Sequence, residues 1–215
     1  MNNKLKTIAT VFALLTGTSF SYAQSSVMKD PVSYKLKSGM TIIIAENEAT
    51  PKVFANLSFE AADKYQAEKA VAKEVLTTLL NQELTAMDAG LSYSDKGVNL
   101  ATQHDQFENA LQTLCAYISA PAFNQDAFDK AKNTVLAHLT AQDKYFPSTI
   151  NKNSLAKLTL DDVNVYYKEI NNPAQTVLTV AGNITAGLAK NYTKKAMNQQ
   201  KPVAETNKTY LVSNN

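Results

Sequence analysis

Residues 79–97, LLNQELTAMDAGLSYSDKG, decide the fold because they lead from a helix through a glycine into a strand. Apolar residues here and just upstream recur at three- and four-residue spacing, as on one wide face of a helix: Ala72, Leu76, Leu79, Leu80, Leu84 and Met87. Gly90 follows where the chain needs a left-handed cap, a conformation that glycine adopts without steric cost. Residues 91–94 then alternate like a half-buried strand. We therefore predict a long helix over residues 67–89 and a strand from Leu91.

The first 23 residues have the three-part layout of a secretory signal peptide. Asn2, Asn3, Lys4 and Lys6 precede an apolar stretch over residues 8–15, and Ser21-Tyr22-Ala23 follows as a small-residue cleavage site. The apolar stretch is too short to span a bilayer, and no later segment is long and apolar enough. We predict cleavage after Ala23, export to the periplasm or out of the cell, and no membrane span.

Charge gives no indication of a nucleic-acid partner. The formal net charge of the whole chain is +2, and removing residues 1–23 takes away Lys4 and Lys6 and no acidic residue. The mature chain is therefore neutral, which argues against binding to nucleic acid. Its length suits one domain. We divide the chain into a signal peptide (1–23), a polar lead-in (24–31), a single domain (32–197) and a polar tail (198–215).

The remaining pattern alternates short strands with amphipathic helices. Strands are expected over residues 32–36 and 40–46 around a Lys37-Ser38-Gly39 turn, over 53–60 with Phe54, Leu57 and Phe59 as bulky residues, over 98–101 and over 176–181. Helices are expected from a capping box of Asp105 and Glu108 to residue 118, around Phe128, Ala131, Val135 and Leu139, over 159–167 and over 185–197. The run Ile42-Ile43-Ile44 indicates burial on both faces. This order predicts an α+β fold with a mostly antiparallel sheet covered by helices on one face.

Cys115 is the only cysteine, so no internal disulfide can form. It recurs with Phe107, Leu111, Leu114 and Ile118 at helical spacing. We therefore expect it to be a small buried residue rather than a reactive thiol.

Several segments together resemble the pitrilysin/insulinase family of zinc peptidases, which includes the mitochondrial processing peptidase. YKLKSGMTIII (34–44) is similar to the family's opening hairpin, and LTLDDVNVYY (158–167) with VLTVAGNI (177–184) is similar to its closing helix and strand. Between them, AMDAGLSY (86–93) is similar to the G-L-x-Y corner of the non-catalytic repeats. Residues 107–138, with Pro121-Ala122-Phe123, match their helix, P-x-F and helix pattern. The resemblance implies a metallopeptidase-half fold of the non-catalytic type.

The zinc chemistry of that family is not carried over. Its catalytic halves bear H-x-x-E-H on a helix, where two histidines one turn apart bind zinc and the glutamate activates water. The corresponding helix here has Ala72, Glu74 and Val75 but no histidine, and only His104 and His138 occur in the whole chain. Zinc is thus the family's cofactor, but its ligands are absent here, and we predict that the chain alone is not catalytic.

The substrate-binding half of the family has an arginine seven residues before the tyrosine of G-L-x-Y. Tyr93 stands at the tyrosine position and is our one candidate substrate-binding residue. Ala86 stands at the arginine position, and the chain contains no arginine at all. A lysine does not reproduce guanidinium geometry.

Three functional hypotheses remain open. In the first, the chain is a non-catalytic subunit that pairs with a catalytic pitrilysin-like subunit in peptide or protein degradation. In the second, it is a stand-alone exported domain that binds an extended peptide at the free edge of its opening strands, or has a structural role. In the third, a residual hydrolase uses a metal site at His104, His138 and a carboxylate, although two isolated histidines give no ligand spacing.

Overall fold

The computed structural model describes residues 29–63, 66–87, 89–94, 97–121 and 123–198. The expected signal peptide and nearly all of the expected polar tail lie outside these ranges. Every helix within them is too short or too polar to cross a membrane.

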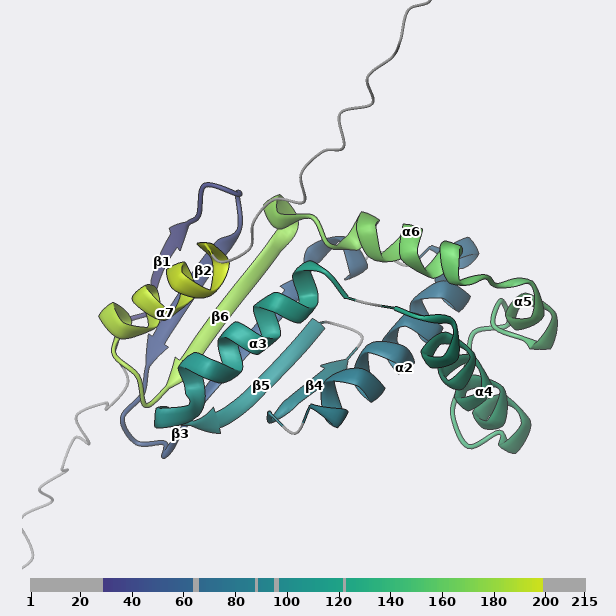
Figure 1. The fold of residues 1–215 in the computed structure, drawn as a ribbon, viewed down its shortest axis with the longest axis horizontal. Helices are drawn as coiled ribbons and strands as arrows, with labels where there is room; N and C mark the ends of the chain where they lie inside the picture. The colour runs from purple at the N-terminus through teal and green to yellow at the C-terminus, as the bar shows by residue number, and fades with distance from the viewer. Residues whose placement is uncertain (1–28, 64–65, 88, 95–96, 122, 199–215) are drawn as a thin grey trace, which may run out of the picture.

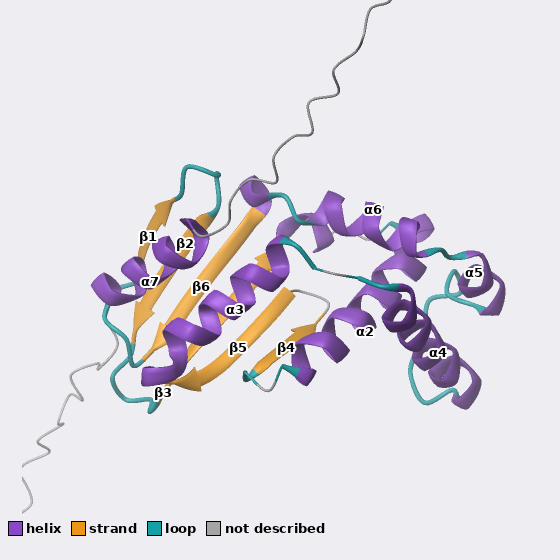
Figure 2. Cartoon of the chain, in the orientation of Figure 1, coloured by secondary structure: helices purple, strands orange, loops and turns teal. Residues whose placement is uncertain are grey.

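A six-stranded sheet forms one layer of the domain (Figures 1 and 2). Its strands are β1 (Val32–Lys35), β2 (Thr41–Glu46), β3 (Lys52–Phe59), β4 (Leu91–Ser94), β5 (Gly97–Gln103) and β6 (Thr176–Gly182), in the order β1-β2-β6-β3-β5-β4. Only β2 and β6 run parallel, and the other four neighbouring pairs are antiparallel. The predicted mostly antiparallel sheet is confirmed.

The helices form the second layer and extend beyond one edge of the sheet. They are α2 (Ala70–Ala86), α3 (Phe107–Ser119), α4 (Gln125–Ala141), α5 (Lys152–Lys157), α6 (Leu160–Ile170) and α7 (Ala186–Asn198). Short 3-10 helices are η1 (Glu60–Asp63), η2 (Ala67–Lys69), η3 (His104–Gln106) and η4 (Pro173–Gln175). Figure 1 shows α3 and α7 lying across the sheet, whereas α2, α4, α5 and α6 gather beyond β4. The α+β class with helices on one face is therefore confirmed.

The strand β3 shows which side of the sheet carries the core. Val53, Ala55, Leu57 and Phe59 are all buried, whereas Phe54, Asn56 and Ser58 point to the other side. Of the three bulky residues of this strand, Leu57 and Phe59 face the core, whereas Phe54 is 43% exposed on the other side. Ile43 of β2 is only half-buried, so the expected burial of both faces is wrong for this run, in which the two buried isoleucines, Ile42 and Ile44, share one face.

The helix-to-strand corner has the predicted form with one correction. Gly90 adopts φ +68° as expected, but α2 ends at Ala86, so the glycine lies beyond the immediate cap. A Cβ at Gly90 would lie 2.2 Å from the carbonyl oxygen of Ala101, and the Ala101 N–H donates to the Gly90 carbonyl at 3.0 Å. Close approach to β5, rather than helix termination, requires the glycine here.

The predicted Asp105–Glu108 capping box is wrong. Asp105 lies in η3, and α3 begins at Phe107 with no side chain capping its first turn. The chain enters α3 through a 3-10 turn, which moves Asp105 away from the capping position.

A capping box does open α6, in the segment where the sequence predicts a helix over residues 159–167. The Thr159 hydroxyl accepts from the Asp162 N–H at 3.2 Å, and the Asp162 carboxylate accepts from the Thr159 N–H at 2.9 Å. The carboxylate also accepts from the Thr159 hydroxyl at 2.7 Å. These hydrogen bonds, first from the hydroxyl and then from the backbone, lower the pKa of Asp162 below its ordinary value.

We expect Asp162→Asn to reduce the melting temperature at neutral pH and to matter less in acid. A carboxyl group with a lowered folded-state pKa stabilises the fold above its unfolded pKa of about 4, and this contribution is lost as pH falls through the folded value. Thermal melts from pH 7 to pH 3 should therefore show the difference between variant and wild type shrinking. Asp161→Asn is the matched control, because Asp161 is exposed in the same first turn and its side chain takes no part in the capping box. A constant difference across this range would contradict the assignment.

Two tyrosine hydroxyls of the core, one with a hydrogen-bond partner in the described part of the chain and one without, allow a matched comparison of stability. The Tyr167 hydroxyl donates to the Ile118 carbonyl at 2.5 Å, whereas the buried Tyr117 hydroxyl has no hydrogen-bond partner among the described residues. We expect Tyr167→Phe to lower the free energy of unfolding by about 0.5–1.5 kcal/mol, the net worth of one hydrogen bond, since the Ile118 carbonyl keeps the Asn171 side-chain amide as a donor at 3.0 Å. Tyr117→Phe should be neutral or stabilising. Urea titration of both variants measures this, and equal losses would contradict the hydrogen-bond assignment.

Candidate interaction surface

The side of the sheet turned away from α3 and α7, here called the open face, carries small and polar side chains. The strand registers place on it Thr41, Ile43 and Ala45 of β2, Val177, Thr179 and Ala181 of β6, Phe54, Asn56 and Ser58 of β3, Asn99 and Ala101 of β5, and Ser92 and Ser94 of β4. No member of this set is charged. Lys35 and Lys52 lie at its margins, at strand ends.

Hydrogen bonds between side chains hold the centre of the open face in place. The Asn56 amide donates to the Asn99 amide oxygen at 2.8 Å, and the Ser58 hydroxyl donates to the Asn56 amide oxygen at 2.5 Å. Phe54 beside them is the largest exposed apolar group of the face. The cores of protein interfaces are depleted of charge and enriched in aromatic residues. The open face therefore suits contact with another protein surface.

No strand among the described residues pairs with the outer side of the edge strand β1. The Leu36 N–H donates to the Met40 carbonyl at 2.9 Å, and antiparallel alternation therefore directs the backbone groups of Ser33 and Lys35 away from β2. An added strand would find hydrogen-bonding groups from only these two residues of β1. The edge is open but short.

The opposite edge strand, β4, is partly closed by α2. The Tyr93 N–H donates to the side-chain oxygen of Asn81 at 3.1 Å, although this N–H lies on the outer side of the strand. A peptide adding to β4 would have to displace Asn81. The two edges of the sheet thus differ in accessibility.

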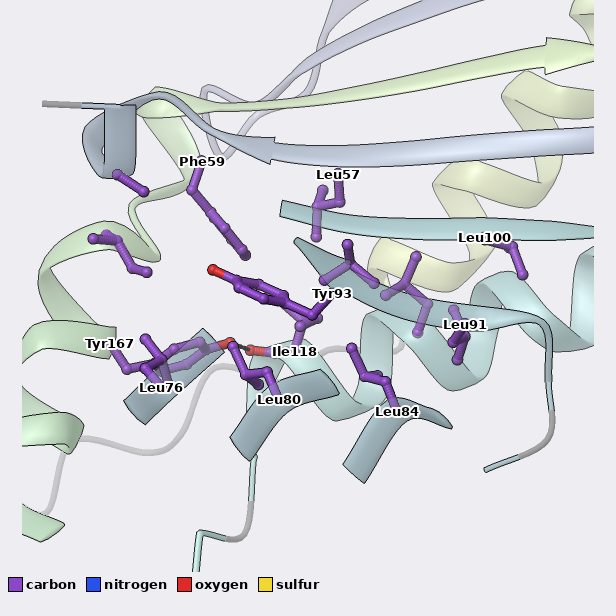
Figure 3. Packing of buried hydrophobic residues seen from close by; sticks show 14 of the residues in the cluster. Leu57, Phe59, Leu76, Leu80, Leu84, Leu91, Tyr93, Leu100, Ile118 and Tyr167 are labelled. Atoms are coloured by element: carbon purple, nitrogen blue, oxygen red, sulfur yellow. Dashed lines mark hydrogen bonds between the residues drawn. The ribbon is translucent and has the colours of Figure 1, made fainter. Parts of the chain in front are cut away.

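Tyr93, the predicted substrate-binding residue, lies with its side chain inside the core. Figure 3 shows its ring between the sheet and α2, close to Leu76 and Leu80. It is 7% exposed, and its ring centroid lies 6.5 Å from that of Phe59. Ala86, at the position of the family's arginine, is exposed at the end of α2. A substrate contact by Tyr93 stays a prediction.

His104 and His138 are held apart in different elements. The His104 Nδ1 lies 2.6 Å from the Asn183 carbonyl oxygen, whereas His138 on α4 lies 2.8 Å from an Asp143 carboxylate oxygen. Within the described ranges, no three histidine, cysteine, aspartate or glutamate side chains converge as metal ligands.

Cys115 is buried in α3, 1% exposed, as the sequence predicts. Burial raises the pKa of its thiol to about 12. The thiol is therefore protonated at neutral pH and offers no nucleophile.

Comparison with known proteins identifies the fold. No protein-family model matches the sequence, and no curated protein does. A peptidase M16 inactive domain from Pseudomonas fluorescens superposes with a TM-score of 0.65 at 16% identity, covering 79% of this chain and 50% of that one. The first half of the periplasmic protease PqqL from Escherichia coli gives 0.62 at 13%, covering 79% and 46%. Pitrilysin gives 0.62 at 17%, covering 80% and 22%.

These similarities establish the fold. They confirm, for the fold, the resemblance stated from the sequence. The domain has the architecture of M16 peptidase domains, including one described as inactive. The chain spans about half the length of the first of these structures and about a fifth of the length of pitrilysin.

Proposed function

We propose that this chain is an exported, non-catalytic pitrilysin-type subunit that pairs with a zinc-bearing relative in peptide or protein degradation. The observation that carries the proposal is an intact peptidase-half fold without the residues that perform the chemistry. The predicted signal peptide supports export, and one structural neighbour is a periplasmic protease.

The family resemblance implies that α2 corresponds to the zinc-binding helix of catalytic halves, and α2 packs into the core. Ala72, Val75 and Leu76 of α2 are buried, with exposed fractions of 6%, 0% and 1%. Alkyl side chains at these positions cannot ligate a metal ion, and their removal from water stabilises the core instead. The chain's own residues therefore support a role other than hydrolysis.

Pairing is supported by the size of a structural neighbour and by the open face. The Pseudomonas fluorescens structure contains about as much chain again as the part that matches this domain. In the proposed complex, a partner of the same fold takes the position of that second half. We place its contact on the open face, where Phe54 and the Asn56–Asn99 pair form an uncharged surface.

Affinity capture of the tagged full-length protein from its exported compartment tests the pairing. Mass spectrometry is expected to identify a partner carrying H-x-x-E-H, and metal analysis is expected to find zinc in the complex. Peptide cleavage sensitive to a chelator should require the partner and be absent from the isolated chain. Repeated recovery of the chain alone would contradict the proposal.

A stand-alone peptide-binding domain is the second candidate, and the open edge of β1 favours it. An extended peptide would pair with the outward backbone groups of Ser33 and Lys35. Titration of unstructured peptides should then protect the amide protons of these two residues from hydrogen exchange. No saturable binding, or protection elsewhere, would exclude this candidate.

A further inference from the structure

A cavity of about 760 Å³ lies between α2, α6, η1 and the loop that follows α4. It is called the α2–α6 cavity below. Its volume falls in the range of small-molecule sites, roughly 300–1,000 Å³. No residue of a β-strand lines it, so it is separate from the open face and from both sheet edges.

Opposite charges balance around the α2–α6 cavity, because three lysines and three glutamates line it. Four of the six form ion pairs with one another. Lys69 pairs with Glu169, and the Lys144 ammonium lies 2.6 Å from a Glu74 carboxylate oxygen. The second pair fixes the loop after α4 against α2.

The remaining two charges are available to a ligand. Lys73 is half-buried and donates to the Ala62 carbonyl at 2.9 Å, and Glu60 is exposed. No ion pair among the described side chains includes either residue. Within the described part of the chain, the cavity thus offers one ammonium and one carboxylate that take part in no ion pair, and the ammonium holds a hydrogen bond to Ala62.

Tyr166 adds an unused hydroxyl to the lining. The residue is 7% exposed, and its hydroxyl makes no hydrogen bond within the described part of the chain. Burial, followed by the nearby Glu169 carboxylate, raises the pKa of this hydroxyl, so it stays protonated and remains a donor. A ligand acceptor could therefore take the place of solvent at this hydroxyl.

We propose that the α2–α6 cavity binds a small zwitterion of the amino-acid or dipeptide class. Its carboxylate would accept from Lys73 and Tyr166, and its ammonium would donate to Glu60. Ile150 and Ile170 also line the cavity and offer apolar surface to a ligand side chain. A simple anion is disfavoured because the glutamates cancel the charge of the lysines. The proposal does not depend on the proposed pairing, since no strand residue takes part.

Calorimetric titration of the full-length protein tests the ligand class. The probes are the dipeptide Ala-Leu, its N-acetyl form, its C-terminal amide and glutarate. Ala-Leu is expected to bind saturably, and blocking either end should weaken binding by about tenfold or more, the worth of one charge-assisted hydrogen bond. Absence of saturable Ala-Leu binding, or equal binding of glutarate, would overturn the proposal.

Variants test which residue of the cavity contacts each end of the ligand. Glu60→Gln should abolish the preference for a free amino group, and Lys73→Met should abolish the preference for the free acid over the amide. Tyr166→Phe should weaken binding of every probe with a free carboxylate. Lys168→Met, a change at an exposed lysine of α6 outside the cavity lining, is the matched control.

Amide chemical shifts of the wild-type protein locate the bound ligand even if the variants fail to fold. Ala-Leu is expected to shift residues of α2 and α6 that line the cavity and to leave β1 unchanged. Binding that is insensitive to both Glu60→Gln and Lys73→Met, or shifts confined to the sheet, would refute the site.

Discussion

Replacing Gly97 by alanine is expected to destabilise the domain by about 3 kcal/mol or more, the upper end of what backbone strain alone costs. Gly97 has φ +136°, and a Cβ there would lie 2.0 Å from the Leu57 carbonyl oxygen. That oxygen belongs to the neighbouring strand β3, which cannot withdraw without breaking the ladder at the centre of the sheet. Chemical denaturation measures the loss.

Gly187→Ala is the matched control for this change. A Cβ at Gly187, in the first turn of α7, would meet nothing within 4 Å. The free energy of unfolding should stay unchanged or rise by up to about 1 kcal/mol, because alanine has the higher helix propensity. Equal effects of the two alanines would show that Gly97 does not lie against β3.

Phe59→Ala is expected to cost about 3–5 kcal/mol, the range for removal of a fully buried aromatic ring. Phe59 is 0% exposed and packs near Tyr93 between the sheet and α2 (Figure 3). Since whole domains are stable by only about 5–15 kcal/mol, the variant should be close to unfolding.

Phe54→Ala, on the same strand, tests which face of the sheet carries the core, because its stability loss can be compared with that of Phe59→Ala. Phe54 is 43% exposed on the open face, so its truncation should cost about 1 kcal/mol or less. Urea titrations of both variants give the comparison. A larger loss at Phe54 than at Phe59 would reverse our assignment of the faces.

The elements that the sequence predicts are those with long periodic patterns or strong local signals. The apolar face of α2, the Lys37-Ser38-Gly39 hairpin and the Thr159 cap each depend on neighbours within a few residues. The helix α5 was not predicted, because it has six residues and only one buried side chain, Leu155. So short a segment shows no period.

Local sequence patterns do not predict which strands pair when the strands are far apart in the chain. The parallel contact of β2 with β6 joins Thr41 to Val177, and no turn residue or period indicates it. This pairing was therefore not predicted.

The candidate surfaces likewise differ in whether neighbouring residues of the sequence are enough to predict them. The open face was accessible to prediction, because strict alternation along β3 separates Phe54 from Leu57 and Phe59. The α2–α6 cavity was not, because Glu60, Lys73 and Tyr166 come from three elements that only the folded chain brings together.

Capture of tagged Phe54→Lys beside the tagged wild type tests the central claim most directly. Leu136→Lys, at a residue of α4 that is 37% exposed, is the matched control for the new charge. We expect the wild type and Leu136→Lys to recover a chain bearing H-x-x-E-H in a one-to-one complex by native mass spectrometry, and Phe54→Lys to lose it while remaining folded. A monomer in all three preparations, or a partner retained by Phe54→Lys, would contradict a supporting subunit that pairs through its open face.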